Sequence, residues 1–231
     1  MNKEKEMIRN RLLDFLFEFL AIFIGISASF WFENQRIDQM KAENLRATLI
    51  ATKSNLEDDI DLLVEDSIEY IKVIHNMDEV VYNKNYEPDT LVYFFGNLQS
   101  SLMVNINRSG FNMLQAGDGF ELLDSKLLEE ISFHYNKSVK DYISNIEEYE
   151  DLEMSKLSDY MIENIPYSSI FPYKSDIEQY SFENLIKDLR FYKRLEFLDL
   201  IRTTNQEICT EVLAESQQLL QHINQHLDHI Q

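Results

Sequence analysis

The sequence is poor in the residues that build tight turns, disulfides and basic surfaces. It has five glycines and three prolines in 231 residues, too few for a strand-rich barrel or for glycine-rich loops that hold phosphates. Its single cysteine, Cys209, excludes an intrachain disulfide and a cysteine-based zinc site. Lysine and arginine number 21 against 41 aspartates and glutamates, and this acidity argues against nucleic acid as a partner.

The charges that are present divide the chain into two parts. Residues 1–36 carry five basic and five acidic residues, so the whole net charge of −20 belongs to residues 37–231. Apolar residues make up 45% of the chain, which is ample for a core. We therefore expect a membrane anchor over 1–36 and an acidic domain over 37–231.

A long apolar run indicates the anchor. Residues 12–32 read LLDFLFEFLAIFIGISASFWF, and 19–32 contain no charge. About 20 helical residues cross the hydrocarbon core of a bilayer, so we predict a transmembrane helix over about 12–32. The alternatives are a buried helix of a soluble protein and a cleaved signal peptide, although bulky Ser-Phe-Trp-Phe-Glu stands where small residues would be needed.

Basic residues flanking this run indicate its orientation. The first eleven residues contain four lysines and arginines, whereas residues 33–50 contain three. The positive-inside rule then predicts a single-pass protein of the bacterial inner membrane with a cytoplasmic N-terminus and a periplasmic C-terminal domain.

Small and acidic residues share one face of the predicted span. They follow one another at spacings of four, three, four and three, and they are Asp14, Glu18, Ala21, Gly25 and Ala28. Small residues let helices approach closely, and a carboxylate inside a membrane usually faces protein or water. We interpret this face as a packing or ion-handling surface, with a second copy of the chain or another membrane protein as partner. The alternative is that Glu18 is merely protonated or reaches towards the interface.

The rest of the chain predicts helices. No glycine or proline occurs between Gly25 and Pro88, so we expect one helix from about 8 to 81, typical of a coiled coil or bundle. Its core positions recur every seven residues, at Leu49, Leu56, Leu63, Tyr70 and Met77, with neighbours that include Ile68 and Ile71. Further helices are expected from Pro88, and over 110–116 before a 117–119 turn. A long helix should begin at Asp124 or Ser125, with that residue as its cap, and end at about 165. After a 166–180 loop, we expect helices over 182–189, capped by Ser181, and over 195–230. The predicted fold class is all-α, with the transmembrane helix continuing into a long helix of an antiparallel helical bundle.

Few side chains suggest chemistry. His222, His226 and His229 lie on one face of the last helix as weak metal candidates, but we favour a solvated C-terminal helix in a Gln/His-rich tail. We expect the acidic runs 57–61 and 147–153 to be solvated helix faces, and Cys209 and His134 to be packed. The sequence contains no catalytic motif, and we predict no cofactor and no metal.

Two stretches carry a family resemblance. One is Glu18-x6-Gly25 followed by Trp31-Phe-Glu33-Asn34, and the other runs from Ser109-Gly-Phe-Asn-Met-Leu to Tyr135. They resemble an uncharacterised family of bacterial single-pass membrane proteins, which have a span containing Glu and Gly and a helical soluble domain. Phe17 departs from the family's glycine, and Trp31 lies earlier than the expected exit tryptophan. The resemblance implies topology and fold but no activity.

These features predict a non-enzymatic, membrane-anchored helical protein that senses or scaffolds, with the lipid bilayer as its first partner. The alternative is a homo-oligomeric membrane effector or ion-conducting assembly that uses the Asp14 and Glu18 face. Pathway, ligand and stoichiometry are not encoded in any motif that we find.

Overall fold

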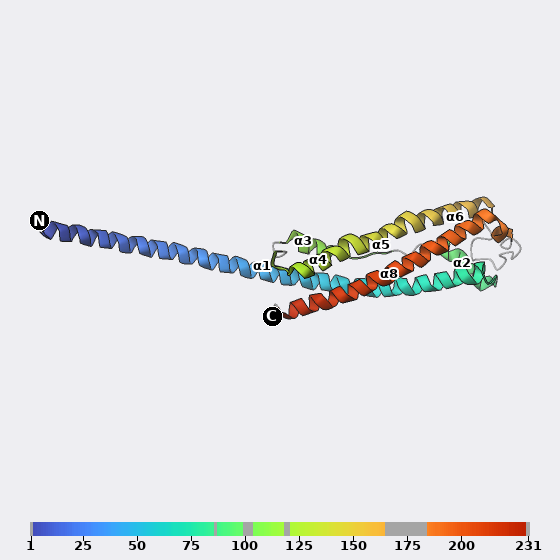
Figure 1. Ribbon diagram of the computed structural model, residues 1–231, viewed down its shortest axis with the longest axis horizontal. Coiled ribbons are helices and arrows are strands. Elements are labelled where there is room, and N and C mark those ends of the chain that lie inside the picture. Colours follow the sequence, from blue (N-terminus) through green and yellow to red (C-terminus); the bar gives the residue numbers. More distant parts are fainter. Residues whose placement is uncertain (1, 86, 99–103, 118–120, 165–183, 230–231) are drawn as a thin grey trace.

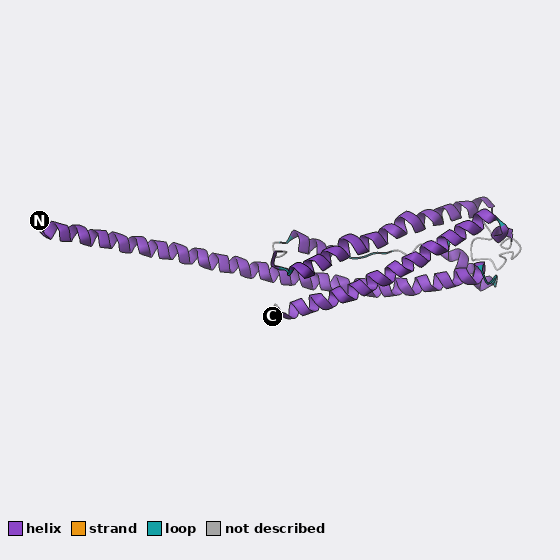
Figure 2. Cartoon of the chain, viewed as in Figure 1, coloured by secondary structure: helices purple, strands orange, loops and turns teal. Residues whose placement is uncertain are grey.

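The structure is a computed structural model that describes residues 2–85, 87–98, 104–117, 121–164 and 184–229. All regular elements in these ranges are helices (Figure 2), so the predicted all-α class is confirmed. Helix α1 (Asn2–Val81) projects far beyond the other helices at its N-terminal end, and its C-terminal half runs beside them (Figure 1). At 1.5 Å per residue it is about 120 Å long.

The C-terminal half of α1 is built on the seven-residue repeat. All five predicted core positions are buried, with exposed fractions of 0–1% at Leu49, Leu56, Leu63, Tyr70 and Met77. Ile68 and Ile71, which we expected beside them, are instead 48% and 55% exposed. Successive residues of a helix are rotated by about 100° around its axis. Ile68, two residues before Tyr70, and Ile71, one residue after it, therefore point away from the buried face.

Two short helices follow α1, as predicted. Helix α2 (Pro88–Asn97) begins at its proline, where the missing N–H costs no hydrogen bond. Helix α3 (Ser109–Ala116) lies against α1, because the Gly110 N–H donates to Asn55 Oδ1 at 3.2 Å. A β-carbon on Gly110 would lie 2.6 Å from the backbone N and Cα of Thr52, so this close approach depends on glycine.

The predicted long helix from 125 to about 165 is present, but two π-helical segments interrupt it. Its parts are α4 (Ser125–Phe133), η2 (His134–Ser138), α5 (Val139–Asn145), η3 (Ile146–Glu150) and α6 (Asp151–Asn164). Asp124 occupies the N-cap position of α4, yet its side chain makes no capping hydrogen bond, so that part of the prediction was wrong.

Helix α8 (Leu189–His229) begins six residues before the predicted start at 195. Asp188 explains the earlier start, because its Oδ1 accepts a hydrogen bond of 2.8 Å from the Arg190 N–H, as an N-cap residue does. The predicted 166–180 loop, the Ser181 cap and most of the 117–119 turn lie outside the described residues.

Three clusters of apolar side chains form the core, and each includes residues of both α1 and α8. The first joins α1 near Met77 to α2, α6 and α8 near Leu195. The second, around Leu63, includes Cys209, which is fully buried as predicted. The third lies where α1 leaves the other helices and joins Leu45 to α3, α4 and Ile223 of α8.

Candidate functional site

The apolar segment of α1 stands apart from the core. Residues 15–32 are exposed throughout, with Phe15 69% and Phe30 68% exposed. Among the described helices, α1 is the one that is long and apolar enough to cross a membrane. The core helix of a soluble protein would be buried by the rest of the chain. The apolar segment of α1 is not, so it is not a core helix of this chain.

The small-residue face lies on this exposed segment. Glu18, Ala21, Gly25 and Ala28 are all exposed, and Asp14 precedes them in the same helix. A β-carbon at Gly25 would meet nothing within 4 Å. The missing side chain leaves a shallow groove along the helix, lined by Ile22, Ile26, Ser29, Phe30 and Glu33.

The three histidines of α8 do not form a common ligand set. His222 Nδ1 lies 2.6 Å from Glu130 Oε2 of α4, so this histidine has a carboxylate partner. Within the described ranges, no group of three His, Cys, Asp or Glu side chains is arranged to hold a metal ion. His226 and His229 line the same surface hollow as His222 but are not brought into such a group.

Most acidic side chains of the runs 57–61 and 147–153 are exposed, as expected, but Glu150 belongs to a buried polar network. Glu150, the last residue of η3, accepts from Arg202 Nε at 2.9 Å through Oε1. Its Oε2 accepts from Tyr70 Oη at 3.0 Å and from Asn205 Nδ2 at 2.8 Å. All four side chains are buried, so the prediction for 147–153 was wrong at Glu150.

Further contacts extend the network around Arg202. Arg202 Nη2 donates to the Asn97 carbonyl oxygen at 2.6 Å, and its nitrogens contact the sulfur atoms of Met77 and Met154. Burial, and then the Glu150 carboxylate, raise the pKa of Tyr70 well above its ordinary value. With solvent excluded and its carboxylate fully engaged, this network fixes α1, α2, η3 and α8 relative to one another.

Two other acidic residues that we expected to be solvated, Glu153 and Asp59, are also buried. Glu153 is buried and pairs with Arg194 at 2.7 Å and Lys156 at 3.1 Å. Asp59 of α1 is 1% exposed, and its Oδ1 accepts from the Asn107 N–H at 2.8 Å. Burial raises the pKa of Asp59 to about 6.

A spacing pattern could have revealed Glu150. Buried positions of an ordinary helix alternate between steps of three and four. Here the buried apolar positions, together with Glu150, recur mainly in steps of four: Leu127, Ile131, Tyr135, Val139, Tyr142, Ile146, Glu150, Met154, Leu157 and Met161. Runs of four-residue steps fit the wider turns of the π segments. Extending this series forward from Ile146 places Glu150 in the core.

Comparisons with protein-family models, with curated proteins and with solved structures found no match. The resemblance to uncharacterised single-pass membrane proteins therefore remains a prediction. Its second stretch does have a structural role, because Ser109 and Gly110 at its start contact Asn55 of α1.

Proposed function

We propose that this chain is a non-enzymatic, membrane-anchored sensing or scaffolding protein, held at the bilayer by residues 12–32. The observation that carries the proposal is the continuity of α1, which joins an exposed apolar segment to the core helix of the acidic domain without a break. An exposed apolar surface of this size is costly in water and favourable in lipid.

The geometry of α1 also sets how far the acidic domain stands from the bilayer. Twelve residues lie between Phe32 and Leu45, the first buried residue of the domain, so the two are about 20 Å apart along the helix. The domain carries all of the net negative charge and would be repelled by anionic lipid headgroups. In this proposal it lies in the periplasm of a bacterial cell, anchored in the inner membrane.

The proposed domain architecture is an antiparallel helical bundle. Three pairings between α1 and α8 support it. Residues with higher numbers in α8 are paired with residues with lower numbers in α1, so the two helices run in opposite directions. Arg202 contacts Met77, Asn205 shares Glu150 with Tyr70, and Cys209 lies 3.4 Å from the Leu63 carbonyl oxygen.

A second candidate is a homo-oligomeric effector that conducts ions. The observation that favours it is the exposed Glu18 beside the exposed small residues of the apolar segment. In such an assembly Glu18 would face a neighbouring copy or a water-filled path rather than lipid. The same face also suits association with a different membrane protein.

Membrane anchoring is tested with matched isoleucine-to-lysine variants of the full chain. Wild type should float with liposomes and resist alkaline extraction. Ile22→Lys with Ile26→Lys should release the chain, since each central lysine costs about 2.5–3.5 kcal/mol on insertion scales. Ile50→Lys with Ile71→Lys, at exposed positions of the acidic domain, is the control and should stay bound. Extraction of wild type under these conditions would refute anchoring.

The two candidate functions differ in ion leakage. Liposomes that contain the scaffold should stay sealed to potassium, whereas a conducting oligomer should release it. Leakage that disappears in Glu18→Gln would favour the conducting assembly over the scaffold.

A further inference from the structure

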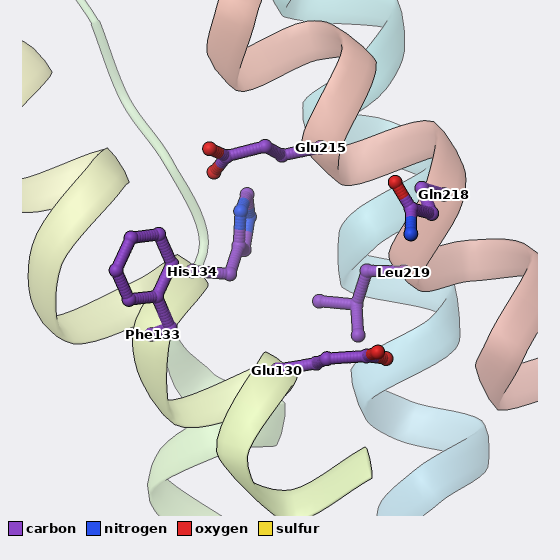
Figure 3. Close-up of a pocket in the computed structure, with 6 residues that line it drawn as sticks. All are labelled: Glu130, Phe133, His134, Glu215, Gln218 and Leu219. Carbon is purple, nitrogen blue, oxygen red and sulfur yellow. The ribbon is translucent and has the colours of Figure 1, made fainter. Parts of the chain in front are cut away.

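A cavity lies between α4, η2 and α8 (Figure 3). Helix α4 lies at the end of the acidic domain where α1 leaves the other helices (Figure 1). Its volume is about 160 Å³. The lining residues are Glu130, Phe133, His134, Glu215, Gln218 and Leu219. It is separate from the buried Glu150 network and from the apolar segment.

His134 supplies an unused hydrogen-bond acceptor to this cavity. It is the first residue of η2, is 3% exposed, and points towards Glu215 of α8 (Figure 3). Its Nδ1 atom has no hydrogen-bond partner among the described residues. Burial lowers the pKa of His134 to about 4, so the ring is neutral at pH 7 and Nδ1 can accept when Nε2 carries the proton.

Glu215 supplies a second unused acceptor. Its Oε2 atom is buried and likewise has no partner in the described part of the chain. A buried acceptor without a partner loses the hydrogen bonds it would make in water, so two of them facing one cavity indicate a missing donor. Glu130 adds a second carboxylate, which His222 and Lys126 hold at the rim.

The remaining lining residues are Leu219, Phe133 and Gln218, and the first two give the cavity apolar walls. Leu219 is buried, and the Phe133 ring is half-exposed beside the opening. A cavity of this volume holds a molecule about the size of benzene. The site therefore has room for a short apolar body as well as for a donor group.

We propose that this cavity binds a soluble primary ammonium compound with a short apolar chain. An ammonium group has three donors and no acceptor, which suits His134 Nδ1 and the carboxylates of Glu215 and Glu130. The two carboxylates disfavour anions. A neutral alcohol would leave the charge of Glu215 uncompensated.

A metal ion fits this site less well than an ammonium group. The described residues offer no group of three metal-type ligands, and Leu219 and Phe133 would contribute nothing to a metal. The π-helical turn that begins at His134 is a further indication of function, because such turns occur frequently at functional sites.

The inference goes beyond the proposed membrane anchoring and is tested separately from it. Binding is measured with the full chain in phosphatidylcholine nanodiscs, which contain no primary ammonium headgroup. The probe is n-butylammonium chloride, the neutral comparison is 1-butanol, and saturation-transfer NMR detects each probe in its bound state. Empty nanodiscs correct for partitioning into lipid, and sodium chloride keeps the ionic strength constant.

We expect n-butylammonium to bind at least tenfold more tightly than 1-butanol. Glu215→Gln should weaken binding about tenfold or more, because it replaces a charge-assisted hydrogen bond by a neutral one. Glu211→Gln changes the same charge one turn earlier on the exposed surface of α8 and should leave affinity within twofold. His134→Leu should also weaken binding, and a melting curve shows whether that variant remains folded.

Three results would overturn the proposal. They are saturation transfer to n-butylammonium no greater than with empty nanodiscs, equal affinity for the amine and the alcohol, and equal weakening by Glu211→Gln and Glu215→Gln. The Glu215 comparison stands even if His134→Leu fails to fold, since Glu215 is only partly buried.

Discussion

Arg202 of α8 and Glu150 of η3 form an ion pair with 2.9 Å between Nε and Oε1, and neither side chain is more than 2% exposed. Such a pair gives little net stability when intact, because both charges lose their hydration. Removing one of the two side chains strongly destabilises the fold, however, because the remaining charge stays buried without a counter-charge. The pair is thus a sensitive point in the acidic domain.

Arg202→Met should lower the free energy of unfolding by about 3–5 kcal/mol, because Glu150 would lose its buried counter-charge. Urea unfolding of the full chain in mild detergent, followed by far-UV circular dichroism, measures the change. Lys72→Met is the control. It breaks an exposed pair with Glu69 at 3.1 Å and should cost less than about 1 kcal/mol.

Adding Glu150→Gln to Arg202→Met should restore part of the lost stability, because the uncompensated charge is then removed. A double variant that is as unstable as the sum of the two single variants would contradict this account of the pair.

Gly110→Ala should destabilise the chain by roughly 1–3 kcal/mol, as overpacking does. Its β-carbon would meet the Thr52 backbone at 2.6 Å, and backbone atoms of α1 cannot move aside as a flexible side chain can. Gly96→Ala is the matched control, since its β-carbon meets nothing within 4 Å inside α2. Alanine favours helix, so this control should be neutral or stabilising. Thermal melting compares the two, and equal melting temperatures would refute the close contact.

Asp59 predicts a pH dependence of stability. Burial raises its pKa from 3.8 to about 6, so the folded chain binds this proton more tightly than the unfolded chain. The resulting stabilisation is complete below pH 3.8 and is lost as the pH rises through about 6. Asp59→Asn cannot titrate at this position, and its amide oxygen can still accept from Asn107.

The stability of wild type relative to Asp59→Asn should therefore fall between pH 4 and pH 7, by up to about 3 kcal/mol for a two-unit shift. Urea unfolding at several pH values gives this difference. Asp66, whose pKa burial also raises to about 6, is common to both proteins and largely cancels. A difference that does not change with pH would show that Asp59 titrates normally.

Gly25→Leu should weaken self-association more than Glu18→Gln. Leucine adds bulk at the groove left by Gly25, whereas glutamine can still form an interhelical hydrogen bond, worth about 0.6 kcal/mol on average. Mass measurement in lipid nanodiscs gives the stoichiometry of each variant. A monomeric wild type, or an unchanged stoichiometry in Gly25→Leu, would leave contact with a different membrane protein as the simplest explanation of this face.

The elements that follow from local rules could be predicted from the sequence. The heptad from Leu49 to Met77 identified the buried face of α1, and Pro88 identified the start of α2. Both signals act within one helix and need no knowledge of what packs against it. The apolar composition of 12–32 predicted the candidate span in the same way, and α1 is the described helix that is apolar enough for one.

Local rules could have placed Glu150 in the core through its spacing, but they could not identify the partners of the buried polar residues. Glu150 lies in a run that reads as solvent-facing, and its burial depends on Arg202 and Asn205, more than 50 residues away in the chain. His134 and Glu215 likewise line one cavity only because α8 packs beside η2 in the folded chain. Composition describes a residue's own preference, whereas pairing between distant residues decides whether a charge can be buried.

Because α1 is one unbroken helix, a rotation at its N-terminal end would displace its C-terminal end. From Phe32 to Val81 the helix covers about 75 Å. In the proposed membrane-anchored arrangement, a tilt of only about 10° at Phe32 would carry the far end of a rigid rod roughly 13 Å sideways. Small adjustments of the span to bilayer thickness or to a neighbouring helix would thus reach the distal end of the acidic domain as displacements wider than a helix.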